Sequence, residues 1–62
     1  MDDEKIEILA NQIDTFLFKM KLRPESWAQK KRQLIGRDPH TYEDHVELYN
    51  AAFRMLQQKP QD

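Results

Sequence analysis

The chain has 62 residues, no cysteine, and 10 Lys or Arg against 11 Asp or Glu, for a formal net charge of −1. This length allows one domain, and a domain so small is marginally stable unless disulfides, metals or self-association support it. The lack of cysteine excludes disulfides and thiolate metal sites. A single glycine among many helix-favouring residues predicts an all-α fold.

The first predicted helix covers about residues 3–22. Apolar residues recur along it at steps of three and four, the spacing of one buried face, at Ile6, Leu9, Ala10, Ile13, Phe16, Leu17 and Met20. A second face carries three further apolar residues with two polar ones between them: Ile8, Phe18, Leu22, Asn11 and Thr15. The helix should stop at Arg23 because a residue before proline disfavours helical geometry.

The second predicted helix covers about residues 24–35. Pro24 suits the first helical position, where its missing N–H is no loss. Gly36, the single glycine, suits a left-handed helix end. The apolar stripe is narrow (Trp27, Ala28, Leu34 and Ile35), so we expect this helix to lie across the other two as a lid.

The third predicted helix covers about residues 41–58, and residues 59–62 should fray. Two start signals compete, Asp38 followed by Pro39, and Thr41 with Asp44 three residues later as a capping box. We prefer Thr41. The predicted core face consists of Tyr42, Val46, Tyr49, Phe53 and Leu56, with Ala52 beside them. A second apolar strip consists of Leu48, Ala51 and Met55.

These patterns predict a single all-α domain over residues 1–62, with helices in the order long, short, long: a helical hairpin with a short lid helix. If the long helices pack through their main faces, five apolar residues on the second faces are left over, namely Ile8, Phe18, Leu22, Leu48 and Met55. We therefore expect the chain to complete its core as a homodimer. The alternative is that the second helix covers these residues within one monomer.

No motif for catalysis or ligand binding is present. His40 and Asp44 would lie one turn apart if the third helix began before His40, but two histidines without cysteine or an HExxH pattern are a weak metal signal. No glycine-rich loop could hold a phosphate. We therefore predict a protein that is not an enzyme and has no metal, cofactor or small-molecule substrate. No apolar run reaches the ~20 residues that cross a bilayer, and the acidic start is unlike a secretion signal. These features predict a cytoplasmic protein.

The expected function is a non-catalytic interaction or regulatory protein that binds a protein partner and modulates it. The predicted partner or dimer interface consists of Ile8, Phe18, Leu22, Trp27, Leu48 and Met55. Phe18 and Trp27, with Leu22 and Arg23 beside them, are the best candidates for one surface patch, and the alternative is that they pack within the corner between the first two helices. Aromatic residues and Arg are common anchors of protein interfaces.

The alternative function is a small DNA- or RNA-binding regulator. Its anion-binding residues would be the basic cluster around the second helix, Arg23, Lys30, Lys31, Arg32 and Arg37. Three features weigh against it. Three of these residues are consecutive, so they point in different directions around a helix, and the isoelectric point near 6.1 lacks the basic footprint of such proteins. The last helix, which would be the reading helix, is acidic at its start through Glu43, Asp44 and Glu47, where it would have to meet phosphates.

Overall fold

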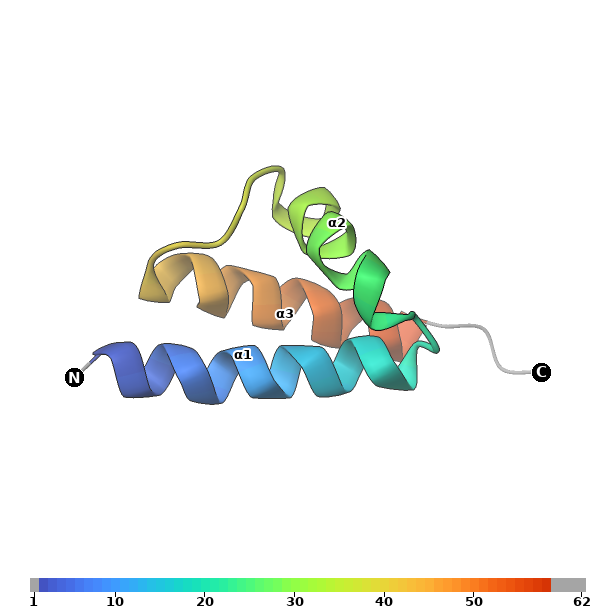
Figure 1. Ribbon diagram of the computed structural model, residues 1–62, viewed down its shortest axis with the longest axis horizontal. Helices are drawn as coiled ribbons and strands as arrows, with labels where there is room; N and C mark the ends of the chain where they lie inside the picture. Colours follow the sequence, from blue (N-terminus) through green and yellow to red (C-terminus); the bar gives the residue numbers. More distant parts are fainter. Residues whose placement is uncertain (1, 59–62) are drawn as a thin grey trace.

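The computed structural model describes residues 2–58 as three helices, α1 (Asp2–Lys19), α2 (Pro24–Ile35) and α3 (Tyr42–Gln58), with no strand in that range (Figure 1). The predicted all-α class with three helices is confirmed. The predicted fraying at 59–62 lies outside the described residues. None of these three helices is long and apolar enough to cross a membrane.

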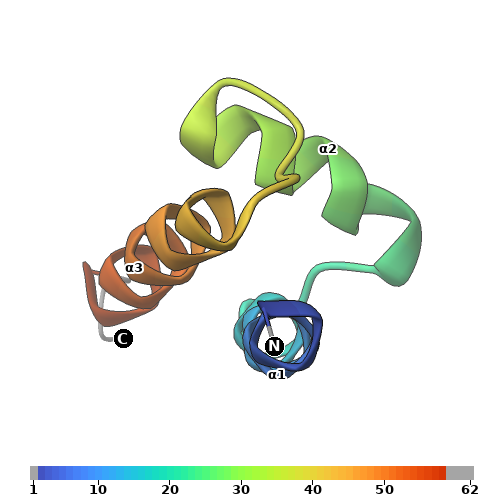
Figure 2. The same ribbon diagram turned by 90° about the vertical axis from the view of Figure 1, so that its left-hand side faces the viewer.

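The two long helices lie side by side and run in the same direction, with α2 lying over one side of the pair (Figures 1 and 2). Near one end, Lys5 Nζ lies 5.9 Å from the centroid of the Tyr42 ring, and further along the ring centroids of Phe16 and Phe53 are 5.9 Å apart. The predicted hairpin of long helices is therefore wrong. Each short connector reverses the direction of the chain, so after two reversals α3 runs in the same direction as α1 (Figure 1).

Helix α1 ends at Lys19, three residues before the predicted end at Leu22. Lys21 has a left-handed backbone with φ 67°. Its N–H donates to the carbonyl of Phe18 at 2.9 Å, and the N–H of Leu22 donates to the carbonyl of Leu17 at 3.1 Å. This pair of bonds is the Schellman helix ending, which normally uses glycine. It turns Leu22 back, so that its side chain packs against the core.

The other helix ends follow the local sequence signals. Helix α2 is followed by Gly36 at φ 76°, whose N–H donates to the carbonyl of Arg32 at 2.7 Å. At the start of α3, the Asp44 N–H donates to Thr41 Oγ1 at 3.1 Å, and the Thr41 N–H donates to Asp44 Oδ2 at 3.2 Å. These bonds form the capping box predicted for Thr41, so α3 begins after Thr41 and not at Asp38.

The core lies where all three helices meet, and its buried apolar residues are Ile13, Leu17, Ile35, Leu48 and Ala52. The prediction that Leu48 is left over is wrong, since its side chain is fully buried. Phe53, predicted in the core, is 42% exposed. The other residues of the predicted face are half-buried, and the fully buried positions, Leu48 and Ala52, lie beside that face. The reason is that α3 must face α1 and α2 together.

Candidate docking surface

A hollow opens at the corner where α1 leads into α2. We call it the corner hollow, and it is lined by Phe18, Lys19, Lys21, Leu22, Arg23, Pro24 and Trp27. The sequence predicted one patch from Phe18, Leu22, Trp27 and Arg23, and the structure brings these four residues to this hollow. Leu22 and Trp27 are half-buried and pack against the core, whereas Phe18 is 71% exposed. At this corner, Leu22 and Trp27 therefore pack within the molecule, and Phe18 lies on its surface.

The floor of the corner hollow is fixed by a hydrogen bond between α2 and the connector that precedes it. Trp27 Nε1 donates to the backbone carbonyl of Leu22 at 3.0 Å. Because this bond orients the indole while its ring packs against the core, the apolar floor is preformed. A preformed surface loses little conformational freedom when it binds a partner.

The rim of the corner hollow is positively charged, through Lys19, Lys21 and Arg23. None of the ion pairs within residues 2–58 uses these three side chains. Their charges therefore face solvent around an apolar floor. This arrangement suits a ligand that combines apolar side chains with carboxylates.

The predicted anion-binding cluster does not form one surface. Three of its five members are ion-paired within the chain. Lys31 Nζ lies 2.9 Å from Asp14 Oδ1. The remaining pairs are Arg32 with Asp38 at 3.0 Å, and Arg37 with Asp44 at 2.8 Å and with Glu47 at 2.7 Å. The other two members are separated, because Arg23 lines the corner hollow and Lys30 lines a different one.

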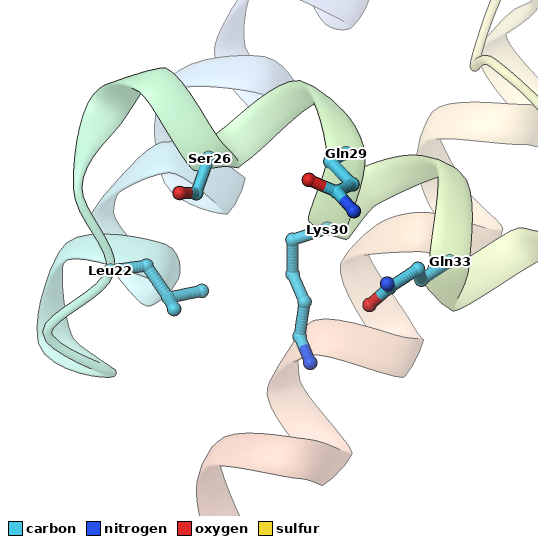
Figure 3. A pocket seen from close by; sticks show the side chains of 5 residues that line it. All are labelled: Leu22, Ser26, Gln29, Lys30 and Gln33. Atoms are coloured by element: carbon cyan, nitrogen blue, oxygen red, sulfur yellow. The ribbon is translucent and has the colours of Figure 1, made fainter.

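That second hollow, the polar hollow, runs along α2 and is lined by Leu22, Ser26, Gln29, Lys30 and Gln33 (Figure 3). Four of the five side chains come from α2, and the Lys30 amine extends between Leu22 and Gln33 in this view. The lining offers a hydroxyl, two amides and one cation. It contains no carboxylate, histidine or thiol, so these five residues provide hydrogen bonds but no acid–base pair.

Arg37 joins the end of α2 to the start of α3. Its guanidinium donates to Asp44, to Glu47 and, at 3.1 Å, to the carbonyl of Ile35. The Arg37 guanidinium, aided by the N–H groups of His40 and Thr41, holds the pKa of Asp44 well below its usual range. The same two carboxylates raise the pKa of Arg37. This network fixes the connector between the helices.

The remaining predicted interface residues differ in their exposure to solvent. Ile8 is 58% exposed and Met55 is 38% exposed, so both lie at the surface. Leu48 is buried and has no surface to offer a partner. One exposed aromatic residue was not predicted, Phe53, which stacks on Tyr49 with ring centroids 6.4 Å apart. Its helical spacing matches that of core residues, so the sequence held no signal for its exposure.

No protein-family model matches this sequence, and comparison with curated proteins and with solved structures gives no match. Within the range 2–58, no group of three or more His, Cys, Asp or Glu side chains is placed to hold a metal ion. The function is therefore inferred from the surface chemistry of the chain itself.

Proposed function

We propose that this chain is a non-catalytic interaction protein that binds an acidic, apolar segment of a protein partner in the corner hollow and thereby modulates that partner. The observation that carries this proposal is the exposed Phe18 ring beside the fixed Trp27 indole, within a rim of bases that form no ion pair in the described chain. Aromatic side chains and Arg contribute most of the binding energy in many interfaces. A basic rim selects acidic partners and speeds their association.

Self-association is the second part of the proposal. Ile8, Phe18 and Met55 remain exposed on a domain too small to bury much surface alone. Full burial of such a side chain contributes about 1.5–3 kcal/mol. A homodimer that covers some of them would therefore add usefully to the stability of the fold.

The partner is tested by capture from an extract of the source cell with three immobilised proteins. Wild type and Ile8→Ser should retain the same protein, and Phe18→Ser should lose it. The reason is that Phe18 lines the corner hollow and Ile8 does not. Ile8 is the matched control, since it is also an exposed apolar residue of α1. A protein retained equally by all three contradicts docking at this hollow.

The chemistry of the partner is tested with synthetic peptides. Trp27 is the only tryptophan, so its fluorescence reports on the corner hollow. Peptides that combine Glu and Leu should bind, and their Lys and Leu counterparts should not. Arg23→Ala should weaken binding, while Lys30→Ala, which lines the polar hollow, should not. Equal binding of acidic and basic peptides contradicts the role of the rim.

The nucleic-acid alternative has less support, because Lys31, Arg32 and Arg37 are each paired with a carboxylate of the chain. Titration with random-sequence DNA and RNA across a salt series tests it. Affinity that falls steeply with salt would favour this alternative, since phosphate contacts release counterions. We expect no binding even at low salt.

A further inference from the structure

One face of α1 forms a continuous exposed stripe, which we call the outer stripe: Glu4, Ile8, Asn11, Thr15 and Phe18. Its members are separated by steps of four, three, four and three residues. This alternation is the pattern of side chains that meet along the seam of two packed helices. The two apolar members are also the most exposed large apolar residues of the described chain, Ile8 at 58% and Phe18 at 71%.

The two ends of α1 carry opposite charges. The first turns contain Asp2, Asp3, Glu4 and Glu7, and their one base, Lys5, is held over the Tyr42 ring on the α3 side. The far end carries Lys19, and the connector that follows it carries Lys21 and Arg23. A second α1 in parallel orientation would place like charges together at both ends. An antiparallel α1 places acids beside bases at both ends, and it also aligns the helix dipoles favourably.

We propose that a second copy of this chain packs against the outer stripe with its α1 antiparallel, so that Ile8 of each copy faces Phe18 of the other and Asn11 faces Thr15. The midpoint of residues 8 and 18 and the midpoint of residues 11 and 15 are both residue 13. A single two-fold axis at the level of residue 13 therefore produces both pairs. A two-fold interface requires such a self-complementary surface. This inference rests on the self-association included in the proposed function, and it supplies the surface and the orientation.

The middle of the stripe fixes the register of the two copies. Thr15 Oγ1 donates to the Asn11 carbonyl at 3.0 Å within its own helix, so its hydroxyl is already satisfied as a donor. The exposed Asn11 amide is then the group that gains a hydrogen bond across the axis. A polar layer in an otherwise apolar seam reduces stability but penalises shifted registers, which leave the polar group unpaired.

The exposed apolar residues of α3 fit a second copy less well. Phe53 and Met55 lie on a helix whose first turn contains Glu43 and Asp44 and whose last turn contains no base. Antiparallel pairing of α3 with itself therefore gains less attraction between its ends than pairing of α1, because Arg54 is the only Lys or Arg within α3. The charge pattern singles out α1 as the helix that recognises its own copy.

The association is tested by sedimentation equilibrium over a wide concentration range. Wild type should form dimers, and Ile8→Ser and Phe18→Ser should each weaken dimerisation by about tenfold or more, equivalent to 1.4 kcal/mol. Met55→Ser is the matched control, because it removes an exposed apolar side chain outside the outer stripe, and it should dimerise like wild type. Circular dichroism should show unchanged helicity in all three variants. Equal loss with Met55→Ser, or no loss with Ile8→Ser, overturns the proposal.

The orientation is tested by spin labels on single cysteines, which the cysteine-free chain accepts without background. In the proposed dimer, labels at Glu4→Cys lie about 27 Å apart along the helix axis, whereas labels at Thr15→Cys lie only about 6 Å apart along it. A parallel dimer places both pairs close together. Short distances at both positions overturn the antiparallel arrangement.

Dimerisation through the outer stripe and peptide binding at the corner hollow can be tested separately. Phe18 belongs to both surfaces, so the second copy and the peptide compete for it. Ile8 lies on the outer stripe but does not line the corner hollow, so Ile8→Ser should become monomeric and bind the acidic peptide at least as tightly as wild type. Arg23→Ala should lose peptide affinity. A wild-type chain that is monomeric at every concentration overturns the dimer and leaves docking at the corner hollow intact. Absence of peptide binding by monomeric Ile8→Ser, with dimerisation of wild type preserved, overturns docking at the corner hollow and leaves the dimer intact.

Discussion

The indole Nε1 of Trp27 donates a hydrogen bond to the backbone carbonyl of Leu22, at a donor–acceptor distance of 3.0 Å. This bond links α2 to the connector that leaves α1, and both side chains pack against the same core. Leu22 reaches this position because Lys21 adopts a left-handed backbone and reverses the chain. The corner hollow thus depends on one helix ending and one hydrogen bond.

Removing this hydrogen bond should destabilise the fold measurably. Trp27→Phe keeps an aromatic ring but leaves the half-buried Leu22 carbonyl without its donor. We expect a loss of about 1 kcal/mol in the free energy of unfolding, measured by urea denaturation with circular dichroism. Phe18→Leu is the control, and since Phe18 is largely exposed, its effect should be within about 0.5 kcal/mol. Equal effects of the two variants would show that the hydrogen bond contributes nothing.

Lys21→Gly should stabilise the chain. A left-handed backbone costs roughly 1–2 kcal/mol for a residue with a side chain, and glycine avoids that cost. We expect a gain of about 1 kcal/mol in urea denaturation. Lys21→Ala removes the same charge without relieving the backbone, so it should not stabilise. A gain shared by both variants would assign the effect to charge instead.

Gly36→Ala is the converse test at the end of α2. No atom lies within 4 Å of the position that a Cβ would occupy, so the only cost comes from the left-handed backbone at φ 76°. The free energy of unfolding should fall by about 1 kcal/mol. Ala28→Gly, a substitution inside the exposed part of α2, should cost a similar amount through helix propensity. Unchanged stability in Gly36→Ala would mean that the end of α2 adopts another conformation.

Leu48→Ala should be among the most damaging substitutions in the chain. Its side chain is fully buried, and truncation of a buried Leu costs about 2–5 kcal/mol. That loss is enough to unfold a domain of this size. Met55→Ala, seven residues later on the same helix, should cost clearly less because Met55 is 38% exposed. If the two variants have equal stability, the buried face of α3 differs from the one described.

Acid should destabilise the chain through Asp44. Because its pKa is lowered in the folded state, its stabilising effect is complete above the ordinary Asp pKa of about 4 and is lost as the pH falls further. Thermal unfolding at a series of pH values should show this loss. Asp44→Asn should be less stable than wild type at neutral pH and should lose less on acidification. Asp38→Asn is the control, since Asp38 pairs with Arg32 on an exposed surface, and it should keep the acid response of wild type.

The sequence determined the local features, because they depend on neighbouring residues. Pro24 and Gly36 mark the ends of α2, and the Thr41 and Asp44 pair marks the start of α3. The spacing of Ile8 and Phe18 identified a second apolar face on α1, and both residues are exposed. The sequence also pointed to the corner of Phe18 and Trp27, since Arg23 and Pro24 fix where the chain turns.

Only the tertiary structure decided which apolar faces meet. Helical spacing shows that Leu48 and Phe53 lie on different faces of α3, but either face could be buried, and the position of α2 selects Leu48. The left-handed Lys21 carries no sequence signal, yet it ends α1 early and turns Leu22 into the core. The basic residues Lys30, Lys31 and Arg32 of α2 are neighbours in sequence, but only Lys31 is paired with a carboxylate of another helix, Asp14 of α1. Burial and ion pairing depend on contacts between distant segments, and a one-dimensional pattern cannot specify those contacts.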